Sequence, residues 1–514
     1  MSRRHRTLIS RRAYALFWDA HSVVGVFTGL ALFVMFFCGA LALYRGELHQ
    51  WADPALRTQT TQVASIDAML APLFDAHPLK PGGGLVLTWP FGDRPYFHVN
   101  YETASGRVAH WIAPQSRETL PEIGRSRLPD ILNDLHFFGQ LGTAGRLLAG
   151  VVGLVCLFAL VTGLAIHLHK LPQDLHTFRP RERLRVSLAD AHAVLGTVGI
   201  PFTAMYALTG AYFSLLLVVY GGLVFGTLGG DRQRLGDLIG GFNRPVYQAA
   251  HVTSPSLSFD ALLARFRAEY ADAPPFIMEI EGWNDAAGLV TFEANANRSL
   301  GSTAIATLRA TTGEIVAGRG SAHTPAMTET AAAFGVLHFA RFGGHLLKAI
   351  FFVLALAASA VMLTGNVLWL EVRRSQHRDA TPWLHRMLAR LTSGVGAGLV
   401  AAVPLLFLTT RVVPIEQPGR MAVEEGMFFG AWALFIVVAQ VVPSAKTSAA
   451  LLIVVGGLLA VAVPFADAWC TGAWPWALAQ RGYWTVFGVD GSFLLAGALL
   501  CWIAYRMLAV STRK

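Results

Sequence analysis

The chain has 514 residues, of which 54% are hydrophobic and only 14% are charged, and its mean hydropathy is +0.47. Soluble domains average about 25% charged residues. This composition therefore excludes an intrinsically disordered chain and a single water-soluble core, which rarely grows beyond roughly 250–300 residues. We interpret the net charge of +9 as a signal of membrane topology, and expect no nucleic acid as a partner. The four cysteines stand in no CxxC or CxxCH motif, which excludes covalently attached haem.

Windows of about 20 apolar residues predict a polytopic α-helical protein embedded in a lipid membrane, with about eight spans. The windows are 14–44, 143–169, 190–226, 343–370, 394–413, 425–443, 448–466 and 485–510. Clusters of arginine and lysine before the first window and after the second and fourth fall on one side of the membrane. The positive-inside rule then predicts that both termini are cytoplasmic.

Two long polar segments, residues 50–135 and 227–335, face the other side of the membrane under this topology. Each opens with a helix-like stretch capped by a serine, Ser65 or Ser258, and continues with short strands. We therefore expect two small α+β domains. The predicted organisation is a first span within 1–49, an outer domain at 50–135, two spans within 136–226, an outer domain at 227–335, a fourth span within 336–375 and four further helices in 376–514.

A duplication of helix, outer domain and helix is the most informative sequence signal. Asp-Ala-His opens the first and third spans at His21 and His192, and Leu-His-Phe recurs at the outer ends of the second and fourth, at His136 and His338. The repeat therefore places one pair of histidines at each membrane face. The last four spans do not follow it.

Histidine in or beside a membrane span is costly and needs a partner. Gly25 and Gly196 follow His21 and His192 by one helical turn, which leaves room on the same face for a large flat group. Two neutral imidazoles that face each other across a bundle are what a six-coordinate b-type haem requires. The sequence therefore predicts two haem b groups, one held by His21 and His192 and the other by His136 and His338.

Alternatives remain open, because a single histidine at a membrane boundary is more often a hydrogen-bonding residue than a ligand. His345 could replace His338, since the two lie on one helical face, and His167 or His169 could replace an inner ligand. Arg146 and Lys348 could contact haem propionates, or could extend toward lipid headgroups.

At these residues the chain resembles the PepSY-associated transmembrane family of bacterial inner-membrane proteins. The resemblance covers about residues 10–375 and rests on both histidine motifs, on the Thr-Gly pairs at Thr162 and Thr364, and on hairpins at Gly106 and Gly313 that are similar to PepSY modules. It implies PepSY-like periplasmic domains and reduction of siderophore-bound ferric iron, with two b haems on His21, His192, His136 and His338. The last four helices depart from the family pattern.

The predicted function is an inner-membrane ferric-chelate reductase for iron acquisition. The chain has no flavin or nicotinamide fingerprint, so electrons would come from quinol or from a separate cytoplasmic reductase and pass to a ferric siderophore or another ferric chelate outside. One alternative is a haem-free PepSY regulator or assembly factor that binds a periplasmic protein or peptide. Another is an iron or siderophore transporter, against which the scarcity of charges within the spans argues.

Overall fold

The computed structural model of the protein divides into two compact units. The helical unit comprises Met1–Leu48, Arg125–Leu215 and His345–Lys514, and the sheet unit comprises His49–Gly124 and Leu216–Gly344. Each unit is described by itself. The structure describes residues 10–57, 64–90, 96–113, 119–120, 126–168, 171, 177–180, 182–240, 242–296, 299–374 and 382–509.

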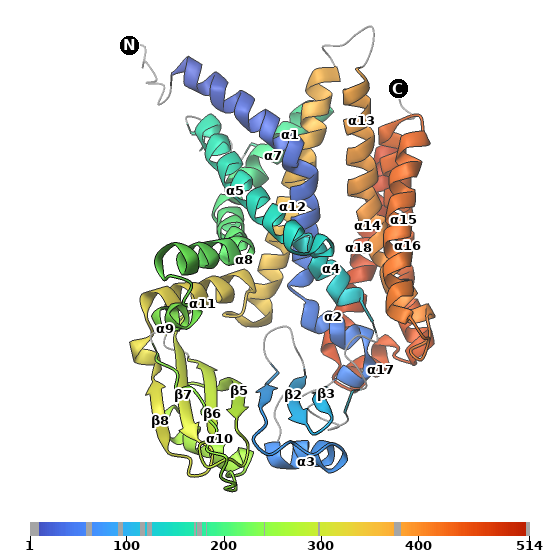
Figure 1. The fold of residues 1–514 in the computed structure, drawn as a ribbon. Coiled ribbons are helices and arrows are strands. Elements are labelled where there is room, and N and C mark those ends of the chain that lie inside the picture. Colours follow the sequence, from blue (N-terminus) through green and yellow to red (C-terminus); the bar gives the residue numbers. More distant parts are fainter. Residues whose placement is uncertain are drawn as a thin grey trace. The chain divides into compact units, whose positions relative to one another are not determined.

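Long apolar helices build the helical unit (Figure 1). Within the described ranges, seven helices are long and apolar enough to cross a membrane, or eight if one bent pair counts as a span. The prediction of a polytopic helical membrane protein is confirmed. The helices, in chain order, are α1 (Arg11–Ala42), α2 (Arg45–Ala52), α4 (Leu128–His136), α5 (Gly142–His167), α7 (Leu184–Val198), α8 (Ile200–Thr227), α12 (Gly344–Arg374), α13 (Trp383–Leu391), α14 (Gly398–Val412), α15 (Arg420–Val441), α16 (Ala445–Thr471), α17 (Pro475–Gln480) and α18 (Trp484–Ala509).

The third predicted span is a bent pair and not one straight helix. α7 and the first part of α8 meet at Gly199 with a bend of 65°. Pro201 follows directly. Its ring lacks the amide hydrogen that a continuous helix needs and clashes with the carbonyl group four residues earlier, so the helix breaks at this point.

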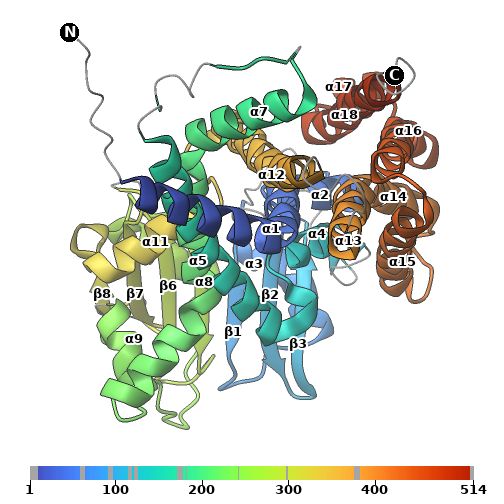
Figure 2. The ribbon, with the colours of Figure 1, turned by 90° about the horizontal axis from the view of Figure 1, so that it is seen from above.

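The C-terminal helices α14, α15, α16 and α18 gather into one group next to α13 (Figure 2). A short π-helical segment, Thr392–Ala397, joins α13 to α14. Its glycines allow close helix contact: a Cβ atom on Gly394 would lie 2.8 Å from the Cα atom of Ile436, and one on Gly396 would lie 3.0 Å from Leu363. These glycines serve helix packing, as their position within a membrane span predicts.

An eight-stranded antiparallel sheet forms the centre of the sheet unit, in the order β4-β3-β2-β1-β5-β6-β7-β8. Its strands are β1 (Leu85–Thr88), β2 (Phe97–Thr103), β3 (Gly106–Ile112), β4 (Thr119–Leu120), β5 (Pro275–Glu281), β6 (Leu289–Asn295), β7 (Thr303–Arg309) and β8 (Ile315–Arg319). Both segments that were expected to form α+β domains contribute strands to this one sheet, because β1 of the first segment pairs with β5 of the second. Pairing joins what would otherwise be two exposed strand edges.

Helices α3 (Ile66–Ala76) and α10 (Phe259–Glu269) cover one face of this sheet. Alternate residues of β2, among them Phe97, Val99 and Tyr101, are fully buried against them. Helices α9 (Arg232–Gly240) and α11 (Ala326–His338) complete the unit.

The two covering helices cap each other. Ser65 and Ser258 are the N-caps, as predicted. In addition, Asp260 accepts the backbone N–H of Ile66 at 2.8 Å, and Asp67 accepts that of Phe259 at 2.9 Å. Each helix therefore supplies the carboxylate that satisfies the amino end of the other.

Candidate functional site

His21 and His192 come together in the helical unit, on α1 and α7. The centroids of their rings are 6.2 Å apart and the ring planes are inclined at 72°. Nδ1 of His21 lies 2.9 Å from the carbonyl oxygen of Ala159 in α5, and Nδ1 of His192 lies 3.0 Å from that of Val361 in α12. A carbonyl oxygen can only accept, so each Nδ1 carries the proton. Nε2 is then the nitrogen with the free lone pair on both rings, which is the form that binds a metal.

Small residues hold these two rings in matching ways. A Cβ atom added at Gly163 would lie 3.0 Å from Cε1 of His21, and one added at Gly365 would lie 3.0 Å from Cε1 of His192. The hydroxyl of Thr162 lies 3.3 Å from Nδ1 of His21 as well. The glycines of the two repeated Thr-Gly pairs thus lie directly against the rings of His21 and His192. Sequence reasoning noted the repetition of these pairs but did not assign them this role.

Gly25 and Gly196, the glycines that the sequence analysis named, do not touch the histidine rings as Gly163 and Gly365 do. A Cβ atom on Gly25 would meet nothing within 4 Å, and one on Gly196 would meet only Val361, at 3.8 Å. Gly25 thus borders open space, whereas a side chain at Gly196 would be in ordinary contact with Val361; room for a bound group at these positions stays a prediction.

His167, at the end of α5, is half-buried and is an electrostatic neighbour of both His21 and His192. It therefore remains close to the inner pair. His169 lies outside the described residues.

His136 is the last residue of α4, a helix outside the candidate spans. Its Nδ1 lies 2.7 Å from the carbonyl oxygen of Met35 in α1, so Nε2 again carries the lone pair. Burial lowers the pKa of His136, and the bond to the Met35 carbonyl opposes this only in part; both the burial and the carbonyl therefore suit the neutral ring that a ligand requires. A Cβ atom on Gly39 would lie 2.5 Å from Nδ1 of His136. This site therefore uses the same three parts as the inner one: a histidine, a carbonyl and a glycine.

His338 is the last residue of α11 in the sheet unit and is 8% exposed, whereas His345, in α12, is exposed. Burial is what a ligand requires, which favours His338 over His345. His136 belongs to the helical unit and His338 to the sheet unit, so their pairing stays a prediction, as does a pairing of His136 with His345.

The chain turns in the same way after both of these histidines. Phe138 and Ala340, each two residues beyond its histidine, adopt left-handed backbone conformations with φ of 56° and 51°. Gly142 and Gly344 follow with φ of 61° and 63°. Non-glycine residues rarely adopt positive φ. Its occurrence at corresponding positions after His136 and His338 therefore supports the equivalence of the two segments.

The two basic candidates lie at different places. Lys348 forms an ion pair with Glu47, with 2.5 Å between Nζ and Oε1, and lies over the ring of Tyr44. Arg146 is exposed, with its guanidinium 4.9 Å from the ring centroid of Phe137. Contact of either residue with a propionate stays a prediction.

A known protein and a known family are similar to this chain. A protein of Pseudomonas aeruginosa that is described as uncharacterized is 29% identical over 402 residues, which covers 74% of this chain and 96% of the relative. The family model of the PepSY-associated TM region matches residues 18–371. This range includes all four motif histidines and ends before α13, so the C-terminal helices lie outside it. Since the match covers more than half of the chain, the protein belongs to the PepSY-associated TM region family.

Proposed function

We propose that this membrane protein is a di-haem b oxidoreductase of the bacterial inner membrane, which delivers electrons to siderophore-bound ferric iron on the periplasmic side. The observation that carries the proposal is that His21 and His192 lie side by side, with ring centroids 6.2 Å apart, and that each has Nδ1 bonded to a backbone carbonyl. Imidazoles held in this tautomer are more basic and cannot rotate freely, which favours ligation through Nε2.

The residues present fit a haem better than a metal ion bound by protein alone. Nowhere in the described ranges do three or more His, Cys, Asp or Glu side chains gather into a group that could hold a metal ion, whereas a structural zinc site needs four ligands. A haem would bring ligands for its iron in its own ring and would need only two more from the protein. His21 and His192, whose ring centroids are 6.2 Å apart, would supply these two.

Helix α1 contacts two histidine positions that lie far apart along its length, which supports two separate sites. α1 carries His21 and also offers the carbonyl of Met35 to His136. The stretch of α1 between these residues is about 21 Å long at 1.5 Å per residue, within a hydrocarbon layer of about 30 Å. An apolar cluster that includes Leu32, Phe36 and Val152 packs beside this stretch and keeps water out. The matching carbonyls, glycines and left-handed turns support a duplicated arrangement, in which we propose His338 as the second ligand of the haem that His136 would hold.

Haem, when bound, would supply a one-electron couple between ferric and ferrous iron. The chain's part is to fix the imidazoles, to exclude water and to present the ferric chelate. In this proposal both termini are cytoplasmic and the sheet unit, with its PepSY-like segments, is periplasmic and binds the chelate. Quinol or a separate cytoplasmic reductase supplies the electrons. Reduction of the chelated iron weakens its attachment to hard oxygen ligands and so releases it.

Visible spectra of protein purified after haem-replete expression test the proposal. We expect a Soret band with sharp α and β bands on reduction, and two haems per chain. Alanine at His21 or His192 should remove one haem, and alanine at His136 or His338 the other. His385→Ala is the matched control, because Nε2 of His385 is already bonded to the carbonyl of Leu370 at 2.8 Å.

The alternatives give different results. Wild-type protein without haem would refute the reductase and favour the regulator that binds a periplasmic protein or peptide. Uptake of intact labelled chelate into vesicles without ferrous iron would indicate a transporter. Loss of haem on His345→Ala but not on His338→Ala would reassign the outer ligand.

A further inference from the structure

A buried carboxylate of the C-terminal helices sits at the start of the helix that carries His136. Glu424, in α15, is 0% exposed. Its Oε1 accepts a bond from Nε of Arg420 at 3.0 Å, and Arg420, 4% exposed, also donates to the carbonyl of Thr410 at 2.6 Å. A buried carboxylate must be paired to be tolerated, and this one has a cation on one oxygen.

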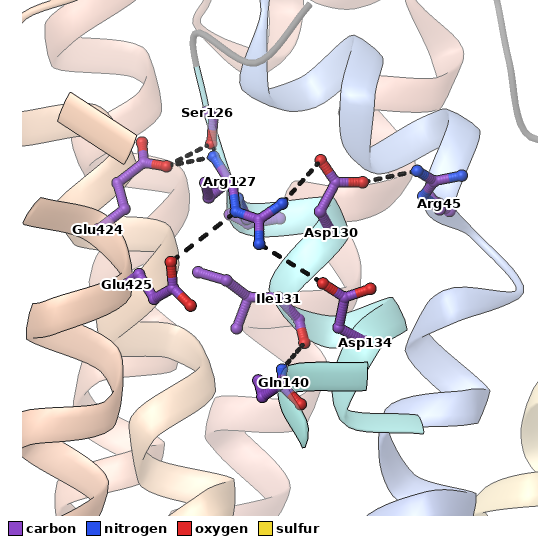
Figure 3. Close-up of polar contacts among 10 residues, drawn as sticks. Arg45, Ser126, Arg127, Asp130, Ile131, Asp134, Gln140, Glu424 and Glu425 are labelled. Carbon is purple, nitrogen blue, oxygen red and sulfur yellow. Dashed lines mark hydrogen bonds and ion pairs between the residues drawn. The ribbon is translucent and has the colours of Figure 1, made fainter. Parts of the chain in front are cut away.

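The other oxygen of Glu424 reaches α4. Oε2 accepts from the hydroxyl of Ser126 at 3.0 Å and from the backbone N–H of Arg127 at 2.5 Å (Figure 3). Arg127 is the N-cap of α4 and offers no side-chain cap of its own. Glu424 therefore places a negative charge at the positive end of the helix dipole and satisfies an amide that the helix leaves unpaired.

The rest of α4 is tied down along its length. Asp130 forms an ion pair with Arg45 of α2, with 2.6 Å between Oδ1 and Nη2. The Arg127 side chain extends along α4 to Asp134, at 3.5 Å, as Figure 3 shows. His136 ends the helix on the carbonyl of Met35. A nine-residue helix is about 13 Å long and moves as one body, so a displacement of its first residue tilts its last.

We propose that Glu424 is a positioning residue for the outer histidine: it holds the amino end of α4 and thereby sets the direction of the His136 ring at the other end. The inference rests on the proposed function for its haem readout, since the orientation of His136 matters most if it is a ligand. It also gives the helices outside the family match a role, because they supply the anchor for a histidine inside it.

Two variants test the anchor and one serves as a control. Glu424→Gln keeps the shape and removes the charge. Ser126→Ala removes one bond to Glu424 and leaves its ion pair with Arg420 intact, so it stays informative if the first variant folds poorly. Glu425→Gln is the matched control, because Glu425 is the next residue, its side chain is 40% exposed, and its ion pair with the Arg127 side chain is long, at 4.0 Å.

The first readout needs no haem. In haem-free full-length protein, we measure how fast diethyl pyrocarbonate modifies His136, by mass spectrometry of the peptide. We expect the rate to rise several-fold in Glu424→Gln and Ser126→Ala and to stay at the wild-type value in Glu425→Gln. Equal rates in all four proteins would overturn the inference.

The second readout uses haem-loaded protein. In a redox titration, the midpoint potential and the low-spin EPR signal of the haem that is lost in His136→Ala should shift in both anchor variants, while the other haem keeps its values. A shift of neither haem, or an equal shift of both, would contradict the positioning role. Wild-type protein that binds no haem would refute the proposed function instead, and the modification rates would still decide the anchor.

Discussion

Gly39→Ala adds a single carbon atom directly against His136. The new Cβ atom would lie 2.5 Å from Nδ1 and 2.7 Å from Cε1 of the ring, whereas ordinary contacts begin at 3.4 Å. The ring must therefore retreat by about 0.9 Å, and this movement opens its 2.7 Å hydrogen bond to the Met35 carbonyl. The substitution thus tests whether glycine is required for the seating of the ring.

The expected magnitude follows from three contributions. A hydrogen bond lost in a buried site costs about 1–3 kcal/mol, and overpacking costs about as much. Alanine in place of glycine in a helix returns about 1 kcal/mol. We expect a net loss of about 1–5 kcal/mol in the free energy of unfolding, together with loss of the haem that His136→Ala removes.

Unfolding of haem-free protein in detergent, followed by circular dichroism, measures the first effect, and haem content measures the second. Gly430→Ala is the control, since it also lies within a candidate span and its Cβ atom would meet nothing within 4 Å. If Gly39→Ala unfolds no more easily than Gly430→Ala and retains both haems, then the His136 ring does not require a glycine at position 39.

Two further predictions address the inner site and the pH response of α4. Gly25→Ala should leave the unfolding of haem-free protein unchanged or slightly improved, because its Cβ atom would meet nothing within 4 Å, yet it should weaken retention of the inner haem. Wild-type haem content would show that this space is not used. Burial raises the pKa of Asp134 more than Arg127 lowers it, with Asp130, Arg45 and Glu425 also facing the group. The protonated carboxyl group of Asp134 is therefore the form that the fold favours. Its contribution to the free energy of unfolding is present below the unfolded pKa of 3.8 and is lost as pH rises through the folded pKa. Asp134→Asn should match wild type at low pH and unfold at a higher temperature near neutrality. A lower unfolding temperature near neutrality would contradict this reasoning.

Local patterns predict the helices and several of their boundaries. Apolar windows locate the spans, because a bilayer requires about 20 apolar residues in each. The serines before α3 and α10 mark helix starts that the structure confirms. Gly313 takes the left-handed conformation expected of its hairpin, with φ of 71°, whereas Gly106 has a φ of 132°, which is positive but outside that region.

Contacts between distant parts of the chain could not be predicted in this way. The pairing of β1 with β5 depends on which strand edges meet after folding, and neither strand's pattern encodes the partner. The bond between Glu424 and the start of α4 likewise joins residues nearly 300 positions apart, and in the sequence Glu424 looks like any polar residue near the end of a span.

In the candidate site, too, local motifs could be predicted from the sequence, whereas contacts between distant residues could not. The repeated motif predicted that His21 and His192 correspond, and the structure brings them together. The carbonyls that fix their tautomer carry no sequence signal, because every residue has one. Gly163 and Gly365 did carry a signal in their repetition, and a glycine repeated beside a repeated histidine is a pattern worth testing for contact.

The mutual capping of α3 and α10 constrains how the sheet unit is assembled during synthesis. The partners are separated by 194 residues, so a ribosome adding about 5–20 residues per second takes roughly 10–40 s to make the second after the first. Throughout this interval β1 presents an unpaired edge, and the amino end of α3 lacks its carboxylate. Such edges attract other chains. The first segment therefore exposes an edge that is open to wrong pairing until its second half emerges.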